Sequence, residues 1–139
     1  MYKHTLEIEN DLSELHRIHD CLERLAEEWN ISPKPVFDIT LTVEELISNV
    51  INYGYEDTGN LIMLTFSLND DVLSILIEDE GKAFNPLDMP APDINAPVED
   101  RKIGGLGIHL AKTLMDSFAY ERKGDRNSVT ITRRISRIK

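Results

Sequence analysis

Three polar residues in the stretch VEELISNVINYGYED are spaced so that they could act together. Glu45, Asn49 and Asn52 follow one another at steps of four and three residues, which return side chains to one face of a helix. The opposite side of this helix is apolar and carries Val43, Leu46, Ile47, Val50 and Ile51. The solvated back of an ordinary surface helix shows the same pattern, so the rest of the chain must decide between the two interpretations.

A carboxylate and a glycine follow the apolar segment that ends in IEDEGKAF. An ionised Asp79 accepts hydrogen bonds only, which suits the exocyclic amino group of adenine. Gly81 has no side chain, so the backbone could approach a planar ligand closely. A plain turn after a strand is the alternative interpretation of the sequence DEG.

Three glycines open the segment GGLGIHLAKTLMDSF, which continues as an amphipathic helix. Because Gly104, Gly105 and Gly107 permit close approach to helix N-terminal amides, they could form an anion site, although a flexible hinge is the alternative. Common nucleotide signatures are missing. The sequence has no G-x-x-x-x-G-K-[ST] run and no H-R-D or D-F-G motif, and GGLGIH lacks the third glycine and preceding strand of a dinucleotide fold. A different nucleotide architecture would be needed.

The elements that must position these residues can be predicted from hydrophobic periodicity. Asn10 or Asp11 would cap the first helix, and Gly54 would stop the second. The expected elements are a strand over 2–8, helices over about 11–29 and 34–53, strands over 61–68 and 72–78, a helix after residue 104, and strands over 118–122 and 128–135. This order predicts an α+β, two-layer sandwich with three main helices on one face of a mixed, mostly antiparallel sheet. We expect one domain over residues 1–139.

Residues 85–102 interrupt this regular pattern. They contain Pro86, Pro90, Pro92 and Pro97, which exclude both a helix and a central strand. Long loops inside a domain are uncommon and often form lids or binding loops, although the composition also fits plain disorder. We expect a mobile lid at about 85–103.

The bulk composition limits the classes of partner. Fifteen Lys and Arg residues against 25 Asp and Glu residues give a formal net charge of −10, which argues against nucleic acid as a direct partner and favours a basic protein partner. The single cysteine excludes an internal disulfide, and no signal peptide or membrane-spanning run is seen. The expected protein is soluble, cytoplasmic and not bound to a membrane.

A metal cluster formed by His16, His19 and Cys21 is a weaker possibility. These residues point to different sides of one predicted helix and lack a fourth ligand. His109, after the glycines, is expected on a helix surface.

Together, the order and spacing of the three motifs resemble a known superfamily. The helix E-x-x-x-N, the strand end D-x-G-x-A-F, the long loop and the segment G-G-x-G resemble the GHKL, or Bergerat-fold, ATP-binding superfamily of histidine kinase-like ATPases. Within it, the short length and the initial strand and two helices resemble the anti-sigma factor serine/threonine kinases. The residues that carry the resemblance are Glu45, Asn49, Asp79, Gly81, Ala83, Phe84, Gly104, Gly105 and Gly107.

The resemblance implies that the chain binds ATP and Mg²⁺. Asn49 would be the metal ligand, because its carbonyl oxygen is a hard donor that suits Mg²⁺. Glu45, one helical turn away, would be the catalytic general base that accepts the proton of an attacking hydroxyl. The cofactor-binding residues that it implies are Asn49, Asp79, Gly81, Ala83, Gly104, Gly105, Leu106, Gly107 and Ile108.

The chain departs from the family pattern at a few positions. Many relatives carry His or Lys three or four residues after the asparagine, where this chain has Asn52 and Tyr53, so turnover could be slow. Ala83 replaces a glycine and adds one methyl group to the pocket. Arg101 and Lys102 could supply the missing positive charge, or they could be ordinary solvated residues.

Three functions follow from the resemblance. The first is a regulatory serine/threonine kinase that acts as an anti-sigma factor in partner switching and phosphorylates a STAS-type antagonist. The second is a catalytically weak, nucleotide-loaded binding module that sequesters a sigma factor or another regulator. The third, the ATPase fragment of a histidine kinase, is disfavoured because no helix pair with a phospho-accepting histidine precedes the ATP motifs. The family also implies a homodimer.

Overall fold

Five strands form one sheet in the part of the chain that the computed structural model describes, residues 2–54, 59–86 and 105–135. They are β1 (Tyr2–Glu9), β2 (Leu61–Asn69), β3 (Val72–Asp79), β4 (Ser117–Lys123) and β5 (Arg126–Arg134). Their spatial order is β1-β2-β3-β5-β4, and every neighbouring pair is antiparallel.

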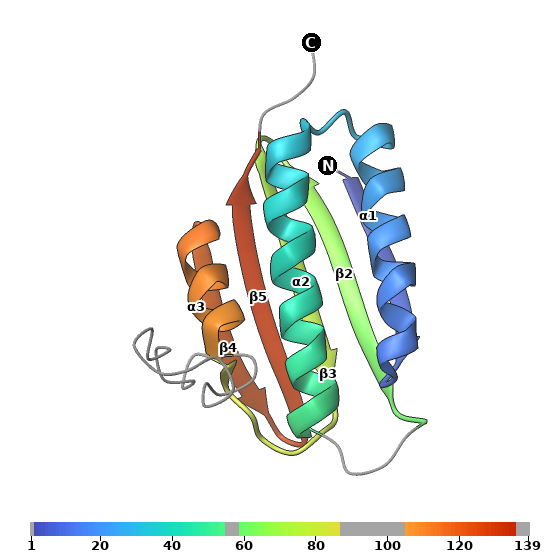
Figure 1. Cartoon of the computed structure of the whole chain (residues 1–139), viewed down its shortest axis with the longest axis vertical. Coiled ribbons are helices and arrows are strands. Elements are labelled where there is room, and N and C mark those ends of the chain that lie inside the picture. Colours follow the sequence, from blue (N-terminus) through green and yellow to red (C-terminus); the bar gives the residue numbers. More distant parts are fainter. Residues whose placement is uncertain (1, 55–58, 87–104, 136–139) are drawn as a thin grey trace.

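The expected α+β sandwich is confirmed, but the sheet is not mixed among the described strands. Two tight hairpins join β2 to β3 and β4 to β5, and such connections pair strands antiparallel. Between β1 and β2 the chain runs up one helix and down the next, so it returns to the end of the sheet that it left (Figure 1). This return also makes β1 and β2 antiparallel.

The core lies between one face of this sheet and the helices. Burial alternates along β2 and β3, as the sequence predicts for strands with one buried face. The buried residues of the three central strands are Ile62, Leu64, Phe66, Leu68, Leu73, Ile75, Ile77, Val129 and Ile131.

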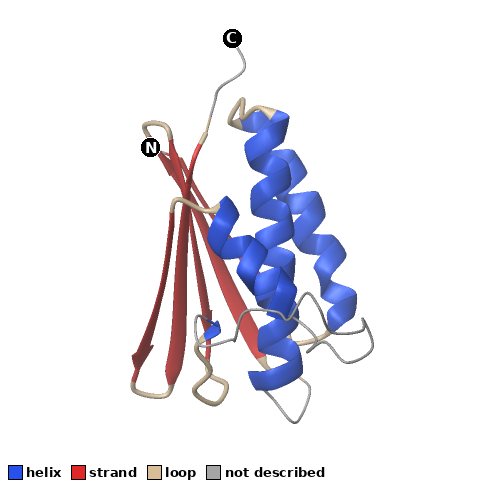
Figure 2. Ribbon diagram, turned by 60° about the vertical axis from the view of Figure 1, so that its left-hand side comes forward, coloured by secondary structure: helices blue, strands red, loops and turns tan. Residues whose placement is uncertain are grey.

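Three helices cover that single face, as Figure 2 shows. They are α1 (Leu15–Glu28), α2 (Pro33–Gly54) and α3 (Gly105–Leu114). A short 3-10 turn, η1 (Leu12–Glu14), leads into α1. The helix α2 lies between α1 and α3 and packs against both (Figure 1). The expected order of elements is confirmed for these residues.

The helix starts differ from the sequence prediction in detail. Asp11 caps the 3-10 turn, where its Oδ1 accepts a hydrogen bond from the Ser13 amide at 3.0 Å. Asn10 instead ties the end of β1 to the start of β2, because its side chain accepts from the Asn60 amide at 2.9 Å. The helix α2 begins at Pro33, one residue early, since proline is well suited to the first position of a helix.

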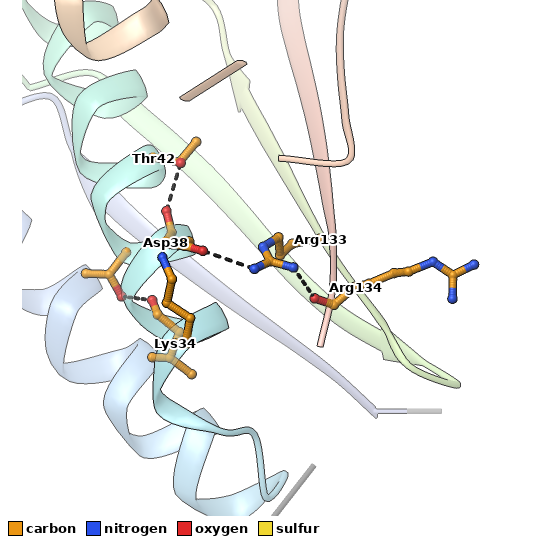
Figure 3. Close-up of polar contacts among 7 residues, drawn as sticks. Lys34, Asp38, Thr42, Arg133 and Arg134 are labelled. Carbon is orange, nitrogen blue, oxygen red and sulfur yellow. Dashed lines mark hydrogen bonds and ion pairs between the residues drawn. The ribbon is translucent and has the colours of Figure 1, made fainter. Parts of the chain in front are cut away.

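A buried acidic residue joins α2 to β5 (Figure 3). Asp38 lies 3.0 Å from Arg133 and 2.6 Å from Lys34, and its backbone carbonyl accepts from the Thr42 hydroxyl at 2.8 Å. Burial raises the pKa of the Asp38 carboxyl, but the hydrogen bonds and charges of Lys34 and Arg133 outweigh this effect and hold the pKa below its ordinary value. The ion pair with Arg133 therefore links α2 directly to β5.

Candidate functional site

The motif residues gather at one end of the fold. The C-terminal half of α2, the end of β3 and the start of β5 all lie at the lower end of the molecule in Figure 1. The first turn of α3 begins at the same end. The sequence motifs, which lie far apart along the chain, are thus brought to a common region by the antiparallel topology.

Glu45 and Asn49 form a direct side-chain pair on α2. The Asn49 amide nitrogen donates to the Glu45 backbone carbonyl at 2.9 Å and to Glu45 Oε1 at 3.3 Å. Asn49 is only 2% exposed and Glu45 is half-buried, while Asn52 is exposed. The stripe is therefore not simply the solvated back of a helix. Both hydrogen bonds use the amide nitrogen of Asn49, so the side-chain carbonyl oxygen of Asn49 takes no part in the contact with Glu45.

Asp79 lies at the inner face of the sheet, at the end of β3, and is 5% exposed. Its Oδ1 accepts from the Gly81 amide at 2.8 Å and from the Asn127 side-chain amide at 3.1 Å. The bond to Gly81 closes a turn, so the turn interpretation of DEG is also correct locally. A turn alone would not require a buried carboxylate, because an isolated buried charge is costly unless it is hydrogen-bonded.

Asn127, at the start of β5, holds this turn in place and was not singled out from the sequence. It pairs with Asp79 in the strand register, and its amide nitrogen also donates to the Lys82 carbonyl at 2.9 Å. Its carbonyl oxygen accepts from the Tyr120 hydroxyl and, at 3.4 Å, from the Phe84 amide. A signal existed in the sequence, since a polar residue stands where the alternation of β5 calls for an apolar one.

A small cavity lies between α2, the end of β3 with the turn that follows it, and the start of β5. Asp79 and Asn127 provide its polar groups, and α2 provides Leu46 and Val50, the residues that follow Glu45 and Asn49 in sequence. The remaining lining residues are Ile77, Phe84, Pro86 and Val129. The arrangement is an apolar slot with a carboxylate in its wall, which is the chemistry that a planar base with an amino group requires.

The cavity volume is only about 10 Å³, space for about one water molecule. Ligand pockets usually measure about 300–1,000 Å³. Phe84 and Pro86 line the slot, and the Phe84 ring stacks on Tyr53 of α2 with centroids 5.7 Å apart. A nucleotide base can therefore enter only if the segment with Phe84 and Pro86 moves outward.

The glycine motif is placed as predicted as far as the structure describes it. The helix α3 starts at Gly105, so Gly105, Leu106, Gly107 and Ile108 form its first turn. Amides of a first helical turn have no partner within the helix and suit an anion. The described residues do not include 87–104. This range contains Gly104, Arg101, Lys102 and most of the lid predicted at about 85–103.

The other predicted positions do not line the slot. Ala83 is exposed at the mouth of the turn, beside the buried Gly81. His109 is exposed on α3, as expected. On α1, Cys21 is buried while His16 and His19 are exposed, so these three side chains do not gather. Burial raises the pKa of the Cys21 thiol.

The class of protein follows from a comparison with known families. The family model described as histidine kinase-like ATPase domain matches residues 8–133. The chain therefore belongs to the histidine kinase-like ATPase domain family, and membership in an ATPase family indicates that it uses ATP.

Individual relatives are similar to this chain over part of its length. The serine-protein kinase RsbW of Bacillus mycoides is 34% identical over 83 residues, which cover 57% of this chain and 52% of that protein. The RsbW protein of Halalkalibacterium halodurans is 38% identical over 86 residues, with coverages of 57% and 51%. The chain thus matches about half the length of these curated relatives.

A solved structure confirms the fold. The crystal structure of the RsbU and RsbW domains of Rv1364c from Mycobacterium tuberculosis superimposes on this chain with a TM-score of 0.72 at 14% identity, covering 99% of this chain and 34% of that one. Among the residues described here, no helix is long and apolar enough to span a membrane.

Proposed function

We propose that the chain is an ATP-dependent serine/threonine protein kinase that acts as an anti-sigma factor. Its substrate would be a STAS-type antagonist protein, and a sigma factor would be its second partner. The observation that carries the proposal is the Glu45–Asn49 pair on α2, beside a slot that contains the buried Asp79. The similarity to proteins named serine-protein kinase RsbW supports a protein hydroxyl as the phosphate acceptor.

The donor set fits both ATP and Mg²⁺. Asp79 would accept the adenine amino group, with Gly81 and Ala83 at the edge of the base. Asn49 would offer its carbonyl oxygen to Mg²⁺, which prefers oxygen ligands and takes the remainder from phosphate and water. The backbone of the segment Gly104, Gly105, Leu106, Gly107 and Ile108 would bind the phosphates at the start of α3.

The chemical step assigned to this chain is a proton transfer. As a serine or threonine oxygen of the partner bonds to the terminal phosphorus of ATP, the bond to the ADP oxygen breaks, and Glu45 accepts the hydroxyl proton. Mg²⁺, when bound, neutralises charge on the phosphates. The hydrogen bond from the Asn49 amide nitrogen to Glu45 Oε1, at 3.3 Å, supports this role, because it holds the proposed base beside the residue that would bind Mg²⁺.

Paired variants test the proposal. Glu45→Ala should leave ATP affinity nearly unchanged and lower phosphate transfer to the STAS protein by about 10²–10⁴-fold, the usual contribution of a general base. Asn49→Ala should reduce Mg²⁺-dependent ATP affinity and transfer together. Glu28→Gln, on the exposed end of α1, is the matched control and should change neither. Transfer by Glu45→Ala at the wild-type rate would overturn the catalytic role.

A second candidate is a nucleotide-loaded module that sequesters a sigma factor with little catalysis. One observation favours it: the Tyr53 ring stacks on Phe84, at one of the two positions, 52 and 53, where the family resemblance implies a cation. A stacked phenol supplies no positive charge to phosphates. Sigma-factor binding that depends on ATP, in a protein that transfers no labelled phosphate to the STAS partner, would support this candidate over the kinase.

A further inference from the structure

An apolar groove lies between α1 and α2 and runs along the N-terminal half of α2, from Pro33 to Glu44. Its volume is about 570 Å³. Its apolar lining residues are Ala26, Ile31, Pro33, Val36, Phe37 and Leu41. Phe37 is 63% exposed and Leu41 is 38% exposed, and the two stand one helical turn apart on α2. Two large apolar side chains that line the groove are thus exposed to solvent.

The rim of this groove is acidic. Glu23 and Glu27 from α1 and Glu44 from α2 line it, together with His19, and no Lys or Arg is among its described lining residues. His19 lies 3.1 Å from Glu23 and 3.8 Å from Glu44, so it bridges the two helices at one end. An occupant must therefore combine an apolar surface with positive charge.

The shape of the groove selects a helix over a strand. Pro33 to Glu44 on α2 is eleven residue steps, or about 16 Å at about 1.5 Å per residue, which matches about three turns of a helix. Both walls are helices, whose backbone hydrogen bonds are internal, so an added strand would find no edge to pair with. An amphipathic helix can bind such a groove through apolar side chains spaced three and four residues apart.

We propose that this groove, here called the α1–α2 groove, docks an amphipathic helix of a protein partner, with an apolar stripe and flanking Lys or Arg residues. Phe37 and Leu41 contact the apolar stripe, and Glu23, Glu27 and Glu44 pair with the basic flanks. The site does not use ATP or the residues around Asp79. It gives the chain a contact surface that is separate from the nucleotide site.

A model peptide tests the groove directly. The probe is a fluorescein-labelled peptide of about 12 residues, with leucines at helical steps of three and four and lysines elsewhere. Fluorescence anisotropy measures its affinity for the whole chain. The variant Phe37→Ala/Leu41→Ala should weaken binding by at least about tenfold, as expected for the loss of buried anchors. The variant Glu23→Lys/Glu27→Lys should weaken binding and flatten its dependence on salt.

Matched controls separate docking from general attraction to an acidic protein. Leu61→Ala removes an exposed leucine from β2, and Glu121→Lys reverses an exposed charge on β4, so both should bind like the wild type. A peptide with glutamates in place of the lysines should not bind. Circular dichroism must show that every variant keeps its helix content, which is expected because Phe37 and Leu41 are exposed.

Two results would overturn the proposal. One is equal affinity of the lysine peptide for the wild type and Phe37→Ala/Leu41→Ala, which would mean that the groove does not hold the apolar stripe. The other is a dimer in sedimentation velocity that Phe37→Ala/Leu41→Ala converts to a monomer, which would mean that a second copy of the chain covers the groove.

Discussion

Asn127→Ala is the most informative single change, because Asn127 connects Asp79, the turn after β3 and the neighbouring strand β4. The substitution removes the bond to Asp79 Oδ1 at 3.1 Å and the bond to the Lys82 carbonyl at 2.9 Å. It also removes the acceptor of the Tyr120 hydroxyl. The contacts at 3.4 Å to the Gly81 carbonyl and from the Phe84 amide are long and count for little.

The expected loss of stability follows from these three bonds. A neutral hydrogen bond contributes about 0.5–1.5 kcal/mol, and one to a charged group contributes about 1.5–3 kcal/mol. The direct sum is about 2.5–6 kcal/mol. A water molecule in the adjacent small cavity can replace some of these hydrogen bonds, so we expect a loss of about 2–4 kcal/mol in the free energy of unfolding.

Urea unfolding measures this loss as a lower midpoint at an unchanged slope. Ser128→Ala is the control, because Ser128 follows on the same strand but faces away from the helices, and its loss should stay within about 0.5 kcal/mol. ATP affinity of Asn127→Ala should fall by about tenfold, since Asp79 loses a partner that orients it. Equal midpoints for Asn127→Ala and Ser128→Ala would refute the role assigned to Asn127.

The remaining predictions concern the base contact, the ion pair and the opening of the slot. Asp79→Asn should weaken ATP binding by about 1–3 kcal/mol, and wild-type protein should bind GTP poorly; equal calorimetric affinities for ATP and GTP would contradict the adenine contact. Asp38→Asn should lower the free energy of unfolding by about 2–3 kcal/mol, less than for a fully buried pair because Arg133 is 23% exposed, whereas Lys34→Met should cost less than about 1 kcal/mol. The folded-state pKa of Asp38 is lowered, so the stability that its charge contributes is present above the unfolded pKa of about 3.9 and is lost as pH falls through the folded pKa. The difference in the free energy of unfolding between wild type and Asp38→Asn should therefore shrink below about pH 4, and a difference that grows there would contradict this reasoning. ATP should change hydrogen exchange in a peptide over 80–86, because Phe84 must leave the slot, while a peptide over 2–9 serves as the control, and unchanged exchange at saturating ATP would mean that the slot does not receive the base.

Local spacing in the sequence was enough to predict the elements and the motif positions. The step of four residues between Glu45 and Asn49 puts both on one face of a helix whatever the rest of the fold does, and the structure brings the two side chains into contact. Alternation along β2 and β3 is likewise a property of neighbouring residues, so their buried faces were predictable. The start of α3 at the glycines is also a local feature.

Contacts between distant residues were decided only by the tertiary structure. Asn127 reaches Asp79 across 48 positions of sequence, and Arg133 reaches Asp38 across 95, because β5 lies beside β3 and under α2. The hydrophobic periodicity of a single helix or strand does not predict these pairings. The closed slot at Phe84 and the groove beside Phe37 have the same origin, since each is the space left where separate elements pack together. The sequence by itself determined which groups are available, and packing determined which of them meet.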